Sequence, residues 1–326
     1  MRRLRYLEAM AEGLRQEMVR DERVFVLGED VRQSLRGVTK GLLEQFGPNR
    51  VLDTPISEAA FTGFATGAAM AGYRPVVEYQ ISALIYVAFD QLVDQAQKIR
   101  FMTGGQVAVP VTYLLPGVGP RRGLAGQHSD QPYSFLVHAG IKVVLPATAA
   151  DARGLMMSAI RDDDPVFFWA PAALLAGRDD VEDNPQPIPL GKSRVHREGT
   201  DVTVVATGHL VPQALKMATE LEADGISAEI WDPRTLLPLD RDGLRKSVEK
   251  TGLLVIFDDS NRFCGFAAEI AAFAAEELWS SLRGPIKRLT RCDVPVPFSL
   301  PIESFVLPDP VRLGETVKRL VQGRSN

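Results

Sequence analysis

Two series of short apolar runs, separated by segments with helical spacing, constrain the fold of this chain more than any other feature. In the first series the runs are at residues 24–27, 76–79, 109–115, 143–145 and 166–169. They lack the alternation of half-exposed strands, and unbroken runs of this kind suit strands covered on both faces. Because helices that connect parallel strands make right-handed crossovers, the series predicts a parallel α/β sheet.

A polar, proline-rich stretch then interrupts the pattern. It contains Asp179, Asp180, Glu182, Asp183, Pro185, Pro187 and Pro189, a composition that buries little surface and favours an extended chain. After it, strands are expected at 202–207, 228–231 and 253–258, and helices at 212–224, 241–250 and 267–279. The sequence therefore predicts an α/β protein with two doubly wound domains, residues 1–178 and 192–326, joined by a linker at 179–191.

The amino-terminal residues predict a helix over 4–19. Its apolar stripe, at steps of three and four, consists of Leu4, Leu7, Met10, Leu14 and Met18. Three arginines near the start are followed at once by Glu8, Glu12 and Glu17 without an apolar signal core, so we expect no targeting peptide. No apolar run approaches the roughly 20 residues that cross a bilayer. We expect a cytoplasmic protein.

Charge and cysteine content argue against a nucleic-acid-binding, membrane-binding or disulfide-rich protein. The 326 residues include 37 basic and 41 acidic side chains, a formal net charge of -4, which gives no electrostatic reason to bind nucleic acid or an anionic membrane. The two cysteines, Cys264 and Cys292, are too few for a disulfide framework and too far apart for a Cys-x-x-Cys motif. Phosphate-binding loops, nucleophile elbows and His-Glu-x-x-His pairs are absent from the sequence.

Two local clusters carry chemistry. In Asp53-Thr54-Pro55-Ile56-Ser57-Glu58, Pro55 keeps the preceding residue extended, Ser57 can cap a helix, and Glu58 falls in its first turn. A carboxylate there is also favoured by the helix dipole alone, so a purely structural role stays open. The second cluster, Gly126-Gln127-His128-Ser129, follows an expected strand, where open parallel sheets bind ligands. A catalytic His128 and a merely packed or exposed one are both compatible with this position.

Read together and in order, six segments resemble the beta subunits of the thiamine-diphosphate-dependent 2-oxoacid dehydrogenases (the pyruvate, branched-chain and acetoin group) within the transketolase-like superfamily. The segments are 50–58, 67–72, 88–91, 127–129, 142–146 and 232–240, and the likeness covers almost the whole chain. The resemblance implies a transketolase-like pyrimidine-binding domain followed by a smaller transketolase C-terminal domain. It also implies that thiamine diphosphate is shared with an alpha subunit, since no Gly-Asp-Gly segment for the diphosphate and its Mg²⁺ occurs here.

The same resemblance implies roles for individual residues. Glu58 matches the glutamate that hydrogen-bonds the aminopyrimidine ring, and Ile56 and Gln80 match positions beside that ring. Leu84 stands where relatives usually have an aromatic residue near the cofactor. His128 matches a histidine that faces the substrate and the incoming lipoyl group. A structural potassium ion is usual at the loop that here contains Ile160, Asp162 and Asp164, although acidic loop residues are more often solvated.

The expected assembly is an α2β2 heterotetramer that decarboxylates a small 2-oxoacid and passes the acyl group to a lipoyl acyltransferase of a multienzyme complex. Two alternatives stay open. One is a transketolase-like transferase without a lipoyl partner. The other is a non-catalytic subunit that retains the fold, which the loss of the aromatic residue at Leu84 would suit.

Overall fold

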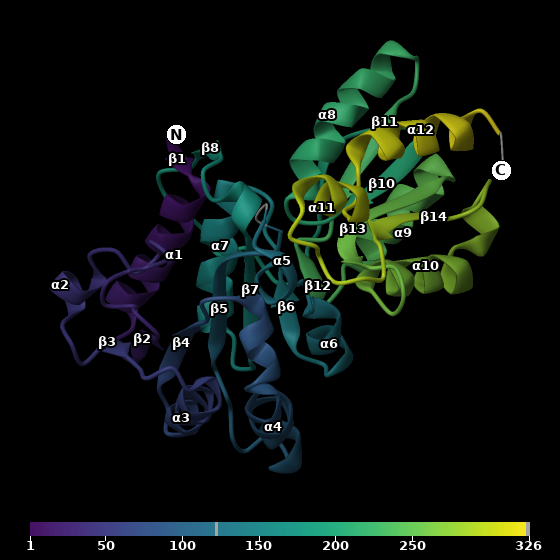
Figure 1. Cartoon of the computed structure of the whole chain (residues 1–326). Coiled ribbons are helices and arrows are strands. Elements are labelled where there is room, and N and C mark those ends of the chain that lie inside the picture. The colour runs from purple at the N-terminus through teal and green to yellow at the C-terminus, as the bar shows by residue number, and fades with distance from the viewer. Residues whose placement is uncertain (121–122, 324–326) are drawn as a thin grey trace. The chain divides into compact units, whose positions relative to one another are not determined.

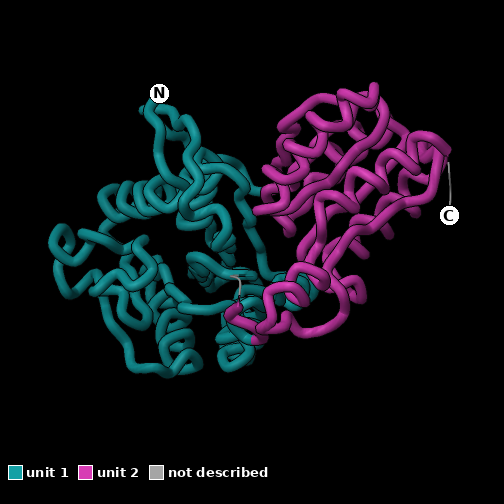
Figure 2. Tube along the Cα trace, turned by 45° about the horizontal axis from the view of Figure 1, so that its top comes forward, with its two compact units in different colours: residues 1–121, 127–190 teal, residues 122–126, 191–326 magenta. Residues whose placement is uncertain are grey.

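The chain divides into two compact units (Figure 2). Unit 1 comprises residues 1–121 and 127–190, and unit 2 comprises residues 122–126 and 191–326. The structure, a computed structural model, describes residues 1–120 and 123–323. The predicted α/β architecture is confirmed in both units.

A wholly parallel sheet forms the centre of unit 1 (Figure 1). Its strands are β2 (Val24–Gly28), β3 (Val51–Asp53), β4 (Arg74–Glu78), β5 (Thr112–Val118), β6 (Lys142–Val144) and β7 (Val166–Pro171). They lie in the order β6-β7-β5-β4-β2-β3. The five apolar runs of the first series all become strands of this sheet, while β3, which has only two apolar residues in succession, was not predicted.

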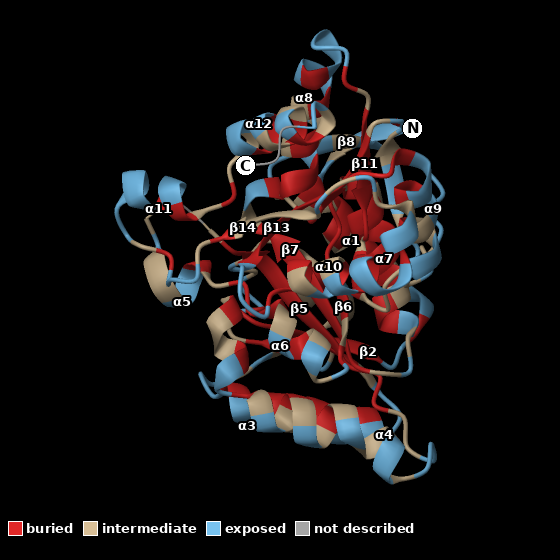
Figure 3. Ribbon diagram, turned by 90° about the vertical axis from the view of Figure 1, so that its right-hand side faces the viewer, coloured by how far each residue is buried: buried red, intermediate tan, exposed pale blue. Residues whose placement is uncertain are grey.

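Each face of this sheet is covered by helices, which explains the unbroken apolar runs. On one face, α1 (Tyr6–Arg20) and α7 (Ala149–Arg161) share a core with alternate strand residues such as Val24, Val26 and Phe168. The strand residues between these face the opposite side of the sheet, which α3 (Glu58–Met70) and α6 (Tyr133–His138) cover. There the ring centroids of Phe61 and Tyr79 are 5.5 Å apart, and those of Tyr133 and Trp169 are 5.7 Å apart. Figure 3 shows the strands buried along most of their length.

Short helical segments complete unit 1. They are α2 (Leu42–Phe46), η1 (Ser82–Tyr86), η2 (Gln91–Gln97), α4 (Lys98–Met102), α5 (Ala125–Ser129), whose first two residues belong to unit 2, and η3 (Ala172–Leu174).

A small antiparallel ribbon joins the two ends of unit 1. Strand β1 (Arg2–Arg5) pairs with β8 (Arg178–Val181), so that Arg2 lies opposite Val181. The helix therefore begins at Tyr6, later than the expected residue 4. Residues 179–190, expected in a linker, lie in unit 1 because the apolar side chains among them find cover: Val181 is buried and Ile188 packs against the core.

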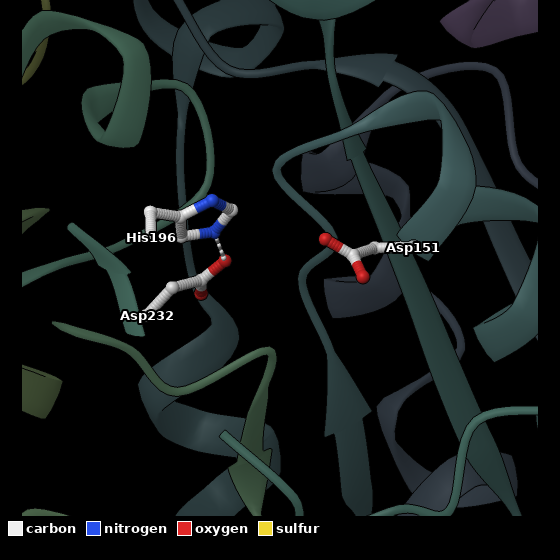
Figure 4. A group of neighbouring side chains, drawn as sticks. All are labelled: Asp151, His196 and Asp232. Atoms are coloured by element: carbon white, nitrogen blue, oxygen red, sulfur yellow. Dashed lines mark hydrogen bonds and ion pairs between the residues drawn. The ribbon is translucent and has the colours of Figure 1, made fainter. Parts of the chain in front are cut away.

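Unit 2 has a second, smaller sheet. Its strands are β9 (Arg194–Arg197), β10 (Val202–Ala206), β11 (Ala228–Asp232), β13 (Leu254–Asn261) and β14 (Lys287–Arg291), in the order β14-β13-β10-β11-β9. All neighbours are parallel except β9 and β11. A side-chain hydrogen bond ties this antiparallel pair together, since His196 Nε2 lies 3.0 Å from Asp232 Oδ2 (Figure 4).

The remaining elements of unit 2 are mostly helices. They are α8 (Leu210–Ala223), α9 (Arg241–Thr251), α10 (Phe266–Glu277), η4 (Trp279–Ser281), α11 (Leu300–Val306) and α12 (Pro310–Val321), together with the short strand β12 (Thr235–Leu237). The three predicted helices agree with α8, α9 and α10 to within two residues at each end. Among the described residues, we find no helix with the length and apolar character of a membrane span.

Candidate active site

The strand order of unit 1 changes direction at the carboxyl ends of β2 and β4. From β2 the chain moves to β3 on one side, and then returns to β4 on the opposite side of β2. Connections therefore leave this point in opposite directions, and open α/β sheets bind ligands where that happens. The residues at this edge are Glu29, directly after β2, and Glu78 and Gln80 at the end of β4.

Gly28 brings the two strand ends together. Its φ of +151° lies in a region that favours glycine, and a Cβ built there would stand 2.5 Å from the carbonyl oxygen of Glu78. A side chain at this position would push β2 and β4 apart. The glycine thus permits the close approach of the β2 and β4 backbones at this edge of the sheet.

Glu58 is the first residue of α3, as the sequence predicts, and its side chain is buried, with 6% exposure. Ser57 is the N-cap residue but makes no side-chain capping hydrogen bond. The first turn is held instead from within the helix, since the Thr62 hydroxyl donates to the Glu58 carbonyl oxygen at 2.5 Å. Thr62 also bonds the Tyr79 hydroxyl, which connects the start of α3 to the residue after β4.

Glu29 and Glu58 form a carboxyl pair. Burial raises the pKa of Glu29, and the negative charge of Glu58 and a hydrogen bond between the two side chains raise it further. The two acids therefore lie close enough to interact in unit 1, at the start of α3. The Oε1 atom of Glu29 is buried without a hydrogen-bond partner in the part of the chain that the structure describes.

A hydrogen-bond network of Gln80 and Arg36 contacts the backbone of Glu29. Gln80 donates from Nε2 to the carbonyl oxygen of Glu29 at 2.7 Å, and its Oε1 accepts from Arg36 Nε at 2.9 Å. Arg36 also bonds the backbone carbonyl of Gln80. Both ends of the Gln80 amide are thus engaged within this chain, which fixes its orientation.

Glu78 closes the network at its buried end. Its side chain is 1% exposed, and burial, only partly offset by the positive charge of Arg36 and by Gln80, raises its pKa to about 8. The Gln80 amide reaches Glu78 Oε1 at 3.5 Å, while Oε2 is buried without a partner among the described residues. Glu78 is therefore largely protonated at neutral pH. This edge of the sheet thus contains two buried acids, Glu58 and Glu78.

The other predicted site residues have different surroundings. Ile56 is 83% exposed in the segment that leads into α3, Leu84 is half-buried in η1, and His128 is exposed in α5. Within the described residues, no hydrogen bond or ion pair joins His128 to Glu58 or Gln80.

The segment after His128 is nevertheless tied to η1. Ser82 Oγ donates to the Asp130 carbonyl oxygen at 2.6 Å, and the Tyr86 hydroxyl donates to Asp130 Oδ2 at 2.7 Å. The loop that carries His128 and the turn that carries Leu84 are thus held together within unit 1.

The potassium candidates already have cationic partners within the chain. Arg74 Nη1 donates to the carbonyl oxygens of Ile160 and Asp162, at 3.1 and 2.9 Å. Lys142 Nζ contacts both carboxylate oxygens of Asp162, at 2.8 and 2.9 Å, and Asp164 at 2.9 Å. Guanidinium and ammonium groups thus stand at the oxygens that would ligate a metal, and these residues do not fit an additional monovalent cation.

Sequence reasoning missed Glu29, Glu78 and Arg36. A signal for Glu78 was present, because an acid inside the apolar run 76–79 has to be buried with that run. Glu29 follows the run 24–27 after a single glycine, at the predicted carboxyl edge. Arg36 comes from a loop whose path the sequence does not indicate.

Comparisons with known proteins agree with this fold. The transketolase pyrimidine-binding domain family matches residues 2–177, and the transketolase C-terminal domain family matches residues 191–313. A structure described as a split-gene transketolase, an inactive beta4 tetramer, superposes with a TM-score of 0.77 at 22% identity, covering 98% of this chain and 99% of the other. This last likeness supports the fold alone.

Two curated relatives extend the match over nearly the whole length. The beta subunit of the pyruvate dehydrogenase E1 component of Rickettsia bellii is 42% identical over 318 residues, 96% of this chain and 97% of the relative. The beta subunit of the acetoin:2,6-dichlorophenolindophenol oxidoreductase of Bacillus subtilis is 42% identical over 322 residues, 94% of each chain. The chain therefore belongs to the family of beta subunits of the thiamine-diphosphate-dependent 2-oxoacid dehydrogenases, within the transketolase-like superfamily.

Proposed function

We propose that this chain is a catalytic beta subunit that supplies the pyrimidine end of a thiamine diphosphate site, with Glu58 as the residue that hydrogen-bonds the aminopyrimidine ring. The observation that carries the proposal is the pairing of buried Glu58 with partly buried Glu29 at the carboxyl edge of the sheet, where burial and the charge of Glu58 raise the pKa of Glu29. A heteroaromatic ring nitrogen is a natural partner for a buried carboxyl that can give or accept a proton.

When bound, thiamine diphosphate supplies the electron sink for decarboxylation of a 2-oxoacid. This chain's residues would orient the ring and handle the proton. Glu58 would hold the proton at the ring nitrogen, and Glu29 would keep Glu58 in place. Gln80 would position Glu29 and would not bind the ring itself, because its amide already bonds Arg36 and the Glu29 carbonyl oxygen. Exposed Ile56 and half-buried Leu84 would contribute apolar surface beside the ring.

We assign His128 to the substrate side of the site. Its imidazole is exposed and can both donate and accept hydrogen bonds, so it suits hydrogen bonding to a carboxylate and proton exchange during acyl transfer to a lipoyl group. Truncation to alanine would then slow acyl transfer more than decarboxylation.

The proposed alpha subunit and Mg²⁺ are inferred from a segment that the sequence does not contain. Without a Gly-Asp-Gly segment, the diphosphate and Mg²⁺ would be bound by an alpha subunit in an α2β2 heterotetramer. A lipoyl acyltransferase would accept the acyl group. Two relatives are named as beta subunits, which supports a divided enzyme.

Glu58→Gln in the assembled enzyme tests the proposal. Replacing the acid removes the proton exchange but keeps size and polarity, so decarboxylation with an artificial electron acceptor should fall by about 10²–10⁴-fold. Glu44→Gln, an exposed acid in α2, is the matched control and should leave the rate unchanged. Normal turnover by the Glu58→Gln enzyme would refute the assignment.

A further inference from the structure

A small pocket lies at the carboxyl edge of the second sheet, within unit 2. It forms where β13 and β14 end and α12 begins, and its volume is about 110 Å³. The charged residues that line it are Arg262, Arg288, Arg291, Arg312 and Asp309. The carboxyl edge is where open α/β sheets bind ligands, so the position of the pocket is itself suggestive of a site.

Two of these residues already have partners within the chain. Arg291 is buried and donates to Asp259 Oδ1 from Nε at 3.1 Å and from Nη2 at 2.9 Å. Asp309 caps α12, where it accepts hydrogen bonds from the backbone N–H groups of Val311 at 3.0 Å and Arg312 at 3.4 Å. Its carboxylate is therefore committed to the helix terminus.

The other three arginines have no carboxylate partner. In residues 1–120 and 123–323, no acidic side chain forms an ion pair with Arg262, Arg288 or Arg312. Arg262 and Arg288 are instead held by each other's backbone: Arg262 Nη1 donates to the Arg288 carbonyl at 3.2 Å, and Arg288 Nη1 donates to the Arg262 carbonyl at 2.9 Å. These reciprocal bonds fix both guanidinium groups and leave their other N–H donors available.

We propose that this pocket binds a tetrahedral oxyanion, either inorganic phosphate or the phosphate group of a small phosphomonoester. Three arginines without an ion-pair partner among the described residues outnumber the one carboxylate, Asp309, at this cavity, so the pocket has an excess of positive charge that attracts an anion. Guanidinium groups match phosphate oxygens with paired N–H donors.

The size of the pocket selects a small ligand. Since a water molecule occupies about 30 Å³ in the liquid, a pocket of about 110 Å³ has room for three or four waters. A phosphate group fits that space, but a nucleotide would have to leave its base and sugar outside. The proposal is independent of the thiamine diphosphate site in unit 1, because every residue that it uses belongs to unit 2.

Titration calorimetry of the full chain with inorganic phosphate, in a buffer free of other oxyanions, tests this site. We expect saturable binding of one phosphate per chain that survives replacement of the buffer salt by an equal concentration of chloride. Arg288→Gln and Arg312→Gln should each weaken binding about ten-fold, the loss expected for one charge-assisted hydrogen bond. Glycerol phosphate, titrated in parallel, distinguishes the two sources: tighter binding than inorganic phosphate identifies a phosphomonoester as the ligand.

The matched control is Arg319→Gln, which removes the same charge from the same helix but away from the pocket, where Arg319 forms an exposed ion pair with Glu315. This variant should bind phosphate as the unaltered chain does. Absence of saturable binding, or equal weakening by Arg319→Gln and Arg312→Gln, would overturn the proposal, since the latter result would indicate only a diffuse effect of net charge. Circular dichroism spectra of all variants verify that each is folded.

Discussion

At the scale of single residues, the buried acid Glu78 has a measurable consequence for stability. Its pKa is raised by burial to about 8, from an ordinary value of 4.5. Between these values the folded chain holds a proton that the unfolded chain has released, so raising the pH from about 4.5 to 8 destabilises the fold. Above about 8 both states are ionised, and this contribution becomes constant.

Glu78→Gln should therefore become more stable relative to the unaltered chain as the pH rises. The difference in free energy of unfolding should grow by roughly 1.4 kcal/mol per pH unit at most, to a few kcal/mol, and level off above about pH 8. Urea unfolding at pH 5, 6.5 and 8 measures it. Exposed Glu44 offers the control, because Glu44→Gln should show no such trend. A constant difference across this range would mean that Glu78 is not a buried acid.

The sequence predicted some residues of the site and not others, for a physical reason. Glu58 belongs to a local helix-start pattern, and Gln80 was named because it matches a position in the family that the chain resembles. Glu29 and Arg36 matter only because the chain returns from β3 to β4 and brings the residues after β2 against Gln80. That proximity depends on strand order, which residue types along the chain do not specify.

At the scale of elements, the contact between β2 and β4 can be tested with two glycines. Gly28→Ala would place a methyl group 2.5 Å from the Glu78 carbonyl oxygen at an unfavourable φ, and we expect it to cost about 2–4 kcal/mol of stability. Gly67→Ala, within α3 and with no atom within 4 Å of the added carbon, should instead stabilise the isolated chain by about 0.5–1 kcal/mol. Chemical unfolding of both variants checks the contrast, and a Gly28→Ala protein as stable as the unaltered chain would contradict it.

The loop after α7 provides a second test at this scale. Arg74 and Lys142 occupy the oxygens of Ile160, Asp162 and Asp164, so replacing potassium chloride by sodium chloride at equal concentration should move the unfolding midpoint by less than about 1 °C. A site saturated at 100 times its dissociation constant would add about 2.7 kcal/mol, which corresponds to several degrees. Stabilisation of that size by potassium alone would show that a metal site exists despite these contacts.

Most strands with apolar runs were predicted, whereas charged edge strands were not, and α12 was also missed although Leu313, Val317 and Leu320 form a buried apolar face on it. The runs at 24–27 and 166–169 became central strands, whereas β1 and β14, with the sequences Arg-Arg-Leu-Arg and Lys-Arg-Leu-Thr-Arg, are edge strands whose charged side chains conceal them. Such strands exist because a neighbouring backbone offers hydrogen bonds, as β8 does for β1. The residue propensities and the periodicity of the strand's own sequence do not indicate which strand it pairs with.

At the scale of the whole molecule, the chain should be able to fold without being able to catalyse. Each unit has its own sheet and its own buried apolar residues. The sequence nevertheless offers only the pyrimidine end of the proposed site, without a Gly-Asp-Gly segment for the diphosphate and Mg²⁺. Folding and activity should therefore separate when the chain is studied alone.

We expect the purified chain to unfold cooperatively but to show no decarboxylation of any 2-oxoacid, even with excess thiamine diphosphate and Mg²⁺. Adding an alpha subunit that carries Gly-Asp-Gly should restore activity in proportion to complex formed, and a lipoyl domain should then become acylated. Chromatography with a decarboxylase assay on each fraction measures both. Activity that elutes with the chain alone would contradict a divided site, whereas an assembled enzyme that decarboxylates but never acylates lipoyl would favour a transferase with another acceptor.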